Sequence, residues 1–170
     1  MSRRSITFLS GGAVLLLAAL TAAGCGGSGS AAPPTTKDGQ AATLGVANDS
    51  IGKVLVNTQG RTLYLFNKDS GTQSTCTGAC AVNWPPLRAN GKPTVGTGAN
   101  ASLATSTPQS GGKSQITYNS HPLYLFKGDQ KAGQTNGEGL TAFGGQWFAV
   151  SPAGNQVSPT TAAPAGGGGY

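Results

Sequence analysis

Charged side chains are scarce in this chain of 170 residues and make up only 9% of it. Five residues are acidic, eleven are basic and one is a histidine, and the basic residues other than the adjacent Arg3 and Arg4 are spread singly. A nucleic-acid-binding surface needs clustered basic residues, so we exclude nucleic acid as a partner. The chain pairs no obvious base with a nucleophile and has no phosphate-binding loop, zinc signature or haem-attachment motif. These absences predict a protein that is not an enzyme and that uses no cofactor.

Long hydrophobic runs are absent as well, except at the N-terminus. There a positively charged start precedes an apolar run from Phe8 to Ala23, and small residues follow. This order is typical of an export signal. The run has about 16 residues, fewer than the roughly 20 that a membrane-spanning helix needs. We therefore expect residues 1–24 to be a cleaved signal peptide.

Only three cysteines are present, and the first directly follows the small residues of the signal. The segment Ala22-Ala23-Gly24-Cys25 resembles a lipobox, where bacterial lipoproteins are cleaved and receive a lipid on the cysteine sulfur. The resemblance implies that Cys25 becomes the first residue of a mature protein anchored to the outer face of the cell membrane.

Two segments have too few large apolar residues to offset the entropy that ordering them would cost. Residues 25–43 and 158–170 are rich in Gly, Ser, Ala, Pro and Thr. We expect the first to be a flexible, lipid-anchored linker and the second to be a disordered tail. The ordered domain is then predicted at residues 44–157.

This predicted domain contains an internal repeat at a spacing of 60 residues. Gly52–Asp69 and Gly112–Asp129 align without a gap and are identical at seven of 18 positions. The shared positions include a Leu-Tyr-Leu-Phe run and the final aspartate, and a tryptophan follows each copy. We therefore expect two copies, at residues 52–87 and 112–150.

Each copy is typical of a β-hairpin. Val54–Val56 and Gln115–Tyr118 are rich in β-branched or aromatic residues, and turn-forming residues follow both segments. The second strand of each hairpin, Leu63–Phe66 or Leu123–Phe126, is apolar throughout, which predicts burial on both faces.

Three further segments are predicted to be strands: Leu44–Ala47, Ser102–Thr105 and Gln146–Val150. The Gly-, Pro- and Asn-containing residues 90–101 are expected to form a connecting loop, and no amphipathic helix is predicted after the signal. The fold class is therefore all-β: a small antiparallel domain of two pseudo-symmetric, hairpin-based repeats.

The joint motif of the two copies resembles a known family. An L-Y-x-F-x-x-D segment, then C-x-x-x-C-x-x-x-W-P-P-L, then P-L-Y-x-F-x-x-D, resembles a bacterial lipoprotein family described as secreted repeats of unknown function. Its hallmark is a tyrosine, four residues and an aspartate, which here are Tyr64 with Asp69 and Tyr124 with Asp129. The resemblance covers residues 46–152. It implies an exported, lipid-anchored, β-rich protein without an established activity.

The two motif aspartates have two interpretations. Each carboxylate could cap the turn after its strand by accepting backbone N–H groups. Alternatively, the two copies could form a polar or cation site, or a catalytic one, with the tyrosine hydroxyls nearby and with Asn136 and Glu138 as further oxygen donors. The aromatic residues of the repeats are expected to fill the core, although some could line a groove for a glycan or a cofactor edge: Tyr64, Phe66, Trp84, Tyr124, Phe126 and Trp147.

The remaining cysteines, Cys76 and Cys80, form an even pair in a compartment where disulfides persist, which favours a structural bridge. The alternative is an extracytoplasmic redox or copper-handling site, because two thiolates with the imidazole of His121 suit copper(I). The sequence as a whole favours a non-enzymatic binding or envelope-structural module. Its expected partners are the membrane, through the lipid on Cys25, and an envelope protein or small ligand.

Overall fold

The computed structural model of the protein describes residues 33–35, 43–109 and 112–157. The predicted signal peptide, most of the predicted linker and the predicted tail lie outside these residues. Within them, no helix is long and apolar enough to cross a membrane. The elements follow in the order β1 (Leu44–Asp49), β2 (Gly52–Asn57), β3 (Tyr64–Phe66), α1 (Ala79–Asn83), β4 (Arg88–Ala89), β5 (Ala104–Pro108), β6 (Ser114–Tyr118), β7 (His121–Pro122), β8 (Thr141–Ala142) and β9 (Gly145–Ala149).

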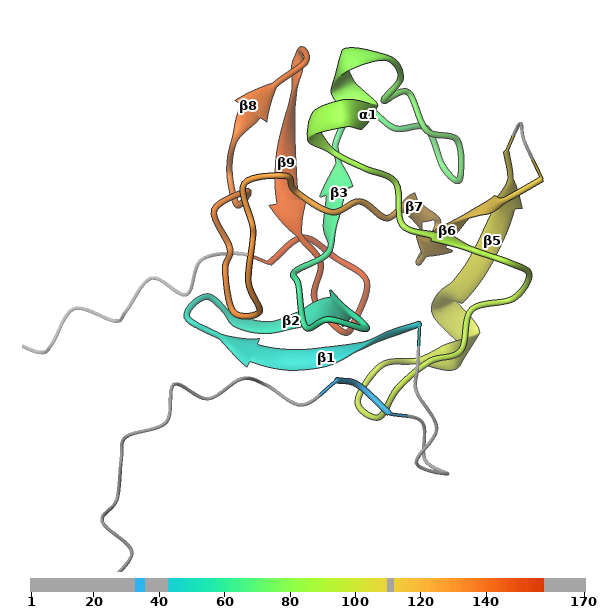
Figure 1. The fold of residues 1–170 in the computed structure, drawn as a ribbon, viewed down its shortest axis with the longest axis vertical. Coiled ribbons are helices and arrows are strands. Elements are labelled where there is room, and N and C mark those ends of the chain that lie inside the picture. The colour runs from blue at the N-terminus through green and yellow to red at the C-terminus, as the bar shows by residue number, and fades with distance from the viewer. Residues whose placement is uncertain (1–32, 36–42, 110–111, 158–170) are drawn as a thin grey trace, which may run out of the picture.

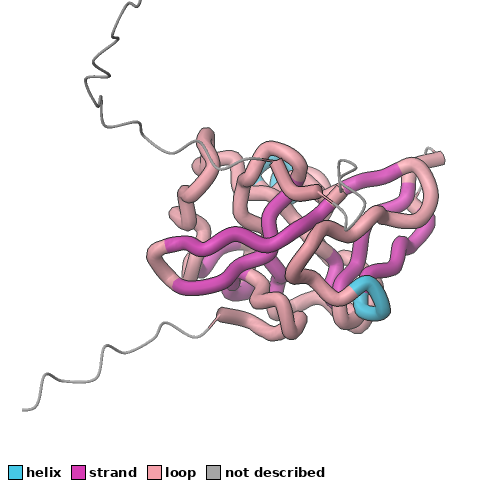
Figure 2. Tube along the Cα trace, turned by 90° about the horizontal axis from the view of Figure 1, so that it is seen from below, coloured by secondary structure: helices cyan, strands magenta, loops and turns pink. Residues whose placement is uncertain are grey.

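The strands form antiparallel sheets, as the all-β prediction expects. β1 pairs with β2, β9 lies between β3 and β8, and β6 lies between β4 and β5 and also pairs with β7. The β1–β2 hairpin lies across one end of the domain (Figures 1 and 2). The helix α1 and the turn between β8 and β9 lie at the opposite end, which we call the distal end (Figure 1). Thr35 of the predicted linker contacts the domain, since Thr97 N–H donates to Thr35 O at 2.8 Å.

The central prediction for Leu63–Phe66 is confirmed, because the strand is buried on both faces. Leu63 and Leu65 point into one apolar cluster, and Tyr64 and Phe66 point into a second one. Successive side chains of a strand alternate between faces, so one short segment connects both halves of the core.

The second predicted strand, Leu123–Phe126, is wrong as a continuous strand. Only Tyr124 is bridged there, to Pro86 on one side and to Tyr64 on the other. The reason is the partner segment, where Pro85 and Pro86 have no N–H to offer a ladder. Two hydrogen bonds form the bridge between Pro86 and Tyr124: Leu87 N–H donates to Leu123 O at 2.8 Å, and Leu125 N–H donates to Pro85 O at 2.9 Å.

The gapless alignment of the copies needs one correction. In the first copy, Leu63 N–H donates to Leu55 O at 2.9 Å. In the second copy, Leu123 N–H donates at the same distance to Ile116 O. Leu55 therefore corresponds to Ile116 rather than to Gln115, and the two hairpins differ in length by one residue.

The extra residue lies in the first turn. There Gly60 N–H donates to Asn57 O at 2.9 Å, and Gly60 adopts a φ of +74°. The second turn is shorter, with Asn119 and Ser120 at φ values of +48° and +63°. Two successive residues of positive φ match the twist of a tight hairpin, and asparagine tolerates this conformation better than most residues.

Two local elements depart from the sequence-based prediction. The segment predicted as a strand at Ser102–Thr105 begins with one 3₁₀ turn, and β5 starts only at Ala104. The Asn100 side chain accepts the Ser102 N–H at 3.0 Å and so starts this turn. The helix α1 has five residues, which is too short to show an apolar period in sequence.

The repeats are interlocked rather than placed side by side. β3 of the first repeat pairs with β9 of the second, with Tyr64 opposite Ala149. Tyr124 of the second repeat pairs with Pro86 of the first. Tyr64 and Tyr124 exchange both backbone hydrogen bonds with each other, each at 2.9 Å. The pseudo-twofold axis therefore passes between the two motif tyrosines.

Candidate functional site: two crossed tyrosine–aspartate pairs

The tyrosine and the aspartate of each motif bond across the pseudo-twofold axis. Tyr64 Oη donates to Oδ2 of Asp129 at 2.6 Å, and Tyr124 Oη donates to Oδ2 of Asp69 at 2.6 Å. Each tyrosine thus uses the aspartate of the other repeat, not the one five residues ahead in its own repeat. One of the two interpretations of the sequence places the hydroxyls near the carboxylates where the copies meet, but the sequence gives no signal for the exchange of partners.

The pair Tyr64–Asp129 is enclosed in the core, and both residues are fully buried. The second carboxylate oxygen, Oδ1, accepts the backbone N–H and the side-chain Nδ2 of Asn136, each at 3.0 Å. The Gly137 N–H donates to Tyr64 Oη at 3.3 Å. Asn136 therefore serves as a donor to the carboxylate. Glu138 is also directed elsewhere, since its Oε2 accepts the Ala149 N–H at 2.5 Å.

The pair Tyr124–Asp69 is built in the same way but is nearer the surface, because Asp69 is half-buried. Its Oδ1 accepts the backbone N–H of Thr75 at 2.7 Å and the Thr75 hydroxyl at 3.0 Å. Tyr124 Oη also lies 2.6 Å from the Ser74 hydroxyl oxygen. In both pairs the aspartate accepts a backbone N–H from the loop that follows it, which is the capping role expected from the sequence.

The hydroxyl protons of both tyrosines are held strongly. Burial raises the pKa of Tyr64 well above its ordinary value, and the hydrogen bond to Asp129 raises that pKa further. Burial and the hydrogen bond to Asp69 raise the pKa of Tyr124 in the same direction. Neither hydroxyl is therefore suited to act as a base near neutral pH.

These raised pKa values predict how stability falls at alkaline pH. Below pH ~10 the two tyrosine hydroxyls are neutral in both the folded and the unfolded protein, so they contribute fully to the free energy of unfolding in that range. Above that pH the unfolded chain loses both phenolic protons while the folded protein keeps them, so stability falls by up to about 2.7 kcal/mol per pH unit. Urea unfolding at a series of alkaline pH values measures this slope. The Tyr64→Phe/Tyr124→Phe variant is expected to lose most of it, and an unchanged slope in that variant would contradict the assignment.

A stack of four aromatic rings lies beside the crossed pairs. Phe66 stacks on Trp147 at 4.1 Å between ring centroids, Trp147 on Trp84 at 3.9 Å, and Trp84 on Phe126 at 4.3 Å. The rings come alternately from the first and the second repeat. Tyr64 contacts Trp84 edge to face at 5.4 Å, and Tyr124 contacts Trp147 likewise at 5.1 Å. These six aromatic residues therefore pack the two repeats together.

Cys76 and Cys80 form a disulfide with 5.2 Å between their Cα atoms, and both sulfurs belong to the apolar cluster of Trp84. Such a short loop yields an entropic stabilisation of about 2 kcal/mol. His121 lies in β7, opposite Tyr118. Among the described residues, no group of three or more His, Cys, Asp or Glu side chains is arranged to hold a metal ion. The copper-handling alternative therefore gains no support from the geometry.

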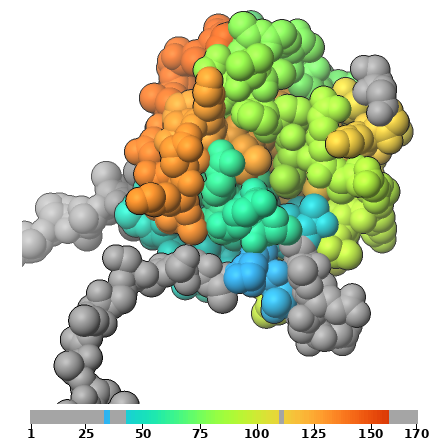
Figure 3. Space-filling view, viewed as in Figure 1, coloured from blue at the N-terminus to red at the C-terminus, as the bar shows by residue number. Residues whose placement is uncertain are grey.

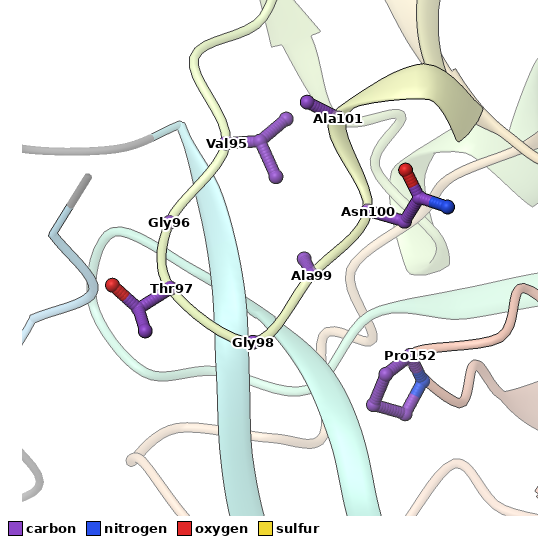
Figure 4. Close-up of a pocket in the computed structure, with 8 residues that line it drawn as sticks. All are labelled: Val95, Gly96, Thr97, Gly98, Ala99, Asn100, Ala101 and Pro152. Carbon is purple, nitrogen blue, oxygen red and sulfur yellow. The ribbon is translucent and has the colours of Figure 1, made fainter. Parts of the chain in front are cut away.

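A cleft of about 740 Å³ lies between the loop Val95–Ala101 and Pro152 (Figure 4). The residues that line it are small or glycine and carry no charge. The loop is part of the predicted connection between the repeats, and the cleft lies apart from the motif residues in sequence. It contains no group that suggests a chemical function.

Residues 45–88 and 105–151 each match the family described as a secreted repeat of unknown function, and together they cover just over half of the chain. The matches include both tyrosine–aspartate motifs and both tryptophans. No curated protein and no solved structure matches the chain. The two family matches agree with the two interlocked repeats, and the chain belongs to this family of secreted repeats.

Proposed function

We propose that the protein is a non-enzymatic binding module, held outside the cytoplasm by a lipid on Cys25. The observation that carries the proposal is the crossing of the two tyrosine–aspartate pairs. The polar groups that define the family motif are used to join the repeats, so the motif supports a fixed shape rather than a reaction.

The environment of the pairs argues against a catalytic role. A general base or acid must come within hydrogen-bond reach of a substrate. Tyr64 and Asp129 are fully buried, and their oxygens bond to each other and to Asn136 and Gly137. Tyr124 and Asp69 are engaged in the equivalent way. A substrate would have to displace the contacts that hold the repeats together.

The position of the linker supports display away from the membrane. Thr35 accepts a hydrogen bond from Thr97 of the domain, so the tether between the lipid and the domain is the nine residues between Cys25 and Thr35, which span at most roughly 30 Å. The domain begins at β1, which lies at the end opposite α1 and the β8–β9 turn (Figures 1 and 3). A lipid on Cys25 therefore leaves the distal end free to meet a ligand or a partner.

The anchoring is tested on protein purified from the cell envelope. Mass spectrometry of the N-terminal peptide is expected to show a mature chain that begins at Cys25 and carries a diacylglyceryl group on Sγ. The Cys25→Ser variant is expected to incorporate no labelled palmitate, while the Cys76→Ser/Cys80→Ser variant incorporates as much as the wild type. A mature protein with a free thiol at Cys25, or one cleaved elsewhere, would refute the anchoring.

A further inference from the structure

Residues that break the pseudo-twofold symmetry gather at the distal end. Lys68 corresponds to Gly128 in the second repeat, where the ring of Phe126 leaves no room, since an added Cβ would lie 2.3 Å from it. The disulfide belongs to the first repeat alone. By the 63-residue spacing that relates Trp84 to Trp147, Cys80 corresponds to Phe143. Features that only one repeat has are not required by the shared fold.

Lys68, Cys80 and Phe143 line one pocket of about 270 Å³, together with Phe66, Thr75 and Thr77. The pocket lies between the β8–β9 turn and the segment that leads into α1. These segments meet at the top of the molecule in Figure 3, in orange-red and green. Phe66 is also the terminal ring of the four-ring stack, so the pocket adjoins that stack.

Phe143 has a conformation that its own turn does not favour. It adopts a φ of +55°, and the following Gly144 has a φ of +80°. Glycine or asparagine is preferred at such turn positions, and a bulky residue there is an outlier. Phe143 is nevertheless 45% exposed, so core packing does not explain why a phenylalanine occupies this position. Strained residues of this kind concentrate at binding sites.

The lining determines which ligand the pocket suits. Lys68 is the one charged residue among the six, and the neighbouring carboxylate of Asp69 is already engaged by Tyr124 and Thr75. Phe143, Phe66 and the disulfide provide an apolar wall for a flat group. The volume is below the roughly 300–1,000 Å³ of sites for drug-sized molecules, which limits the ligand to about one ring.

We propose that this pocket binds a small aromatic carboxylate, with the ring against Phe143 and the carboxylate at the Lys68 ammonium. The inference rests on the proposed binding role and names the chemical class of the ligand. It adds a role to Phe143 that neither the repeat motif nor the core requires.

The test is a titration of the mature protein with phenylacetate, followed by NMR shifts and calorimetry, with phenylacetamide as the uncharged analogue. We expect shifts confined to the pocket residues and their neighbours. Phenylacetamide and the Lys68→Gln variant are each expected to weaken binding about tenfold, the range of one charge-assisted hydrogen bond. The matched variant Lys127→Gln removes an exposed lysine of the second repeat and is expected to bind as the wild type does.

The Phe143→Asn variant separates a binding role from a structural one. Asparagine relieves the strained turn, so the melting temperature is expected to rise by about 3 °C while binding of phenylacetate weakens at least tenfold. Equal binding of phenylacetate and phenylacetamide, unchanged binding in both pocket variants, or an absence of localised shifts would overturn the inference. Those results leave lipidation at Cys25 intact, so the failure of the pocket is distinguishable from the failure of the anchoring.

Discussion

The Asp129→Ala variant is expected to lose about 3 kcal/mol or more of its free energy of unfolding. The change leaves the buried Tyr64 hydroxyl without its acceptor, and it removes the acceptor of the backbone N–H and the side-chain Nδ2 of the exposed residue Asn136. An unsatisfied buried polar group such as this hydroxyl costs about 1–3 kcal/mol, and the loss of the two charge-assisted hydrogen bonds from Asn136 adds to that cost. Urea unfolding followed by circular dichroism measures the loss.

The equivalent variant in the other pair is the matched control. In Asp69→Ala, the Tyr124 hydroxyl keeps the Ser74 oxygen as a partner, and the half-buried site admits water. We expect this variant to lose about half as much stability, near 1.5 kcal/mol. Equal losses in the two variants would contradict the idea that burial distinguishes the pairs, and a negligible loss in Asp129→Ala would contradict the joining role itself.

Truncation of either central tryptophan is expected to have a still larger effect. Trp84→Ala and Trp147→Ala should each cost about 4 kcal/mol, since replacing a buried Trp leaves a cavity that the neighbouring rings cannot fill. Each tryptophan stacks on two rings from the other repeat, so both losses fall on the contact between the repeats. This is a large part of the roughly 5–15 kcal/mol that a domain has in total.

Circular dichroism is the suitable measurement for these variants, because the change removes one of two fluorescent tryptophans. The control is Val82→Ala in α1, two residues before Trp84 and 62% exposed, where we expect a change within about 0.5 kcal/mol. If Trp84→Ala loses no more than this control, the stack does not hold the repeats together.

The apolar Leu-Tyr-Leu-Phe pattern predicted the strand of the first repeat correctly, whereas the same pattern at Leu123–Phe126 forms no continuous strand. Leu63 to Phe66 are apolar at every position, and the strand is buried on both faces as that pattern requires. The pattern could not reveal which repeat supplies the partner of each strand. A hairpin has the same local sequence whether it packs on its own tryptophan or on the tryptophan of the other repeat.

The same limit explains the partners of the motif aspartates. Asp69 follows Tyr64 closely in sequence, which favours a local interpretation, yet Tyr64 bonds to Asp129. The gapless alignment matched Gly52 with Gly112 and therefore matched Leu55 with Gln115. The hydrogen bonds match Leu55 with Ile116 instead. The length of each turn depends on the backbone conformation at Gly60 and at Asn119. Identical residues on either side of a turn do not reveal how long the turn is.

The crossed pairs also suggest how such a fold could have begun. A single repeat on its own would have a tyrosine hydroxyl without its carboxylate and a tryptophan without its stacking partner. Two identical copies would complete each other through the same patch on each, which is the arrangement of a symmetric homodimer. The loop between Ala89 and Ala101 then corresponds to a later covalent connection of two such subunits, after which each half was free to diverge. The disulfide, Lys68 and Phe143 are changes that an obligate homodimer of identical chains could not have confined to one half.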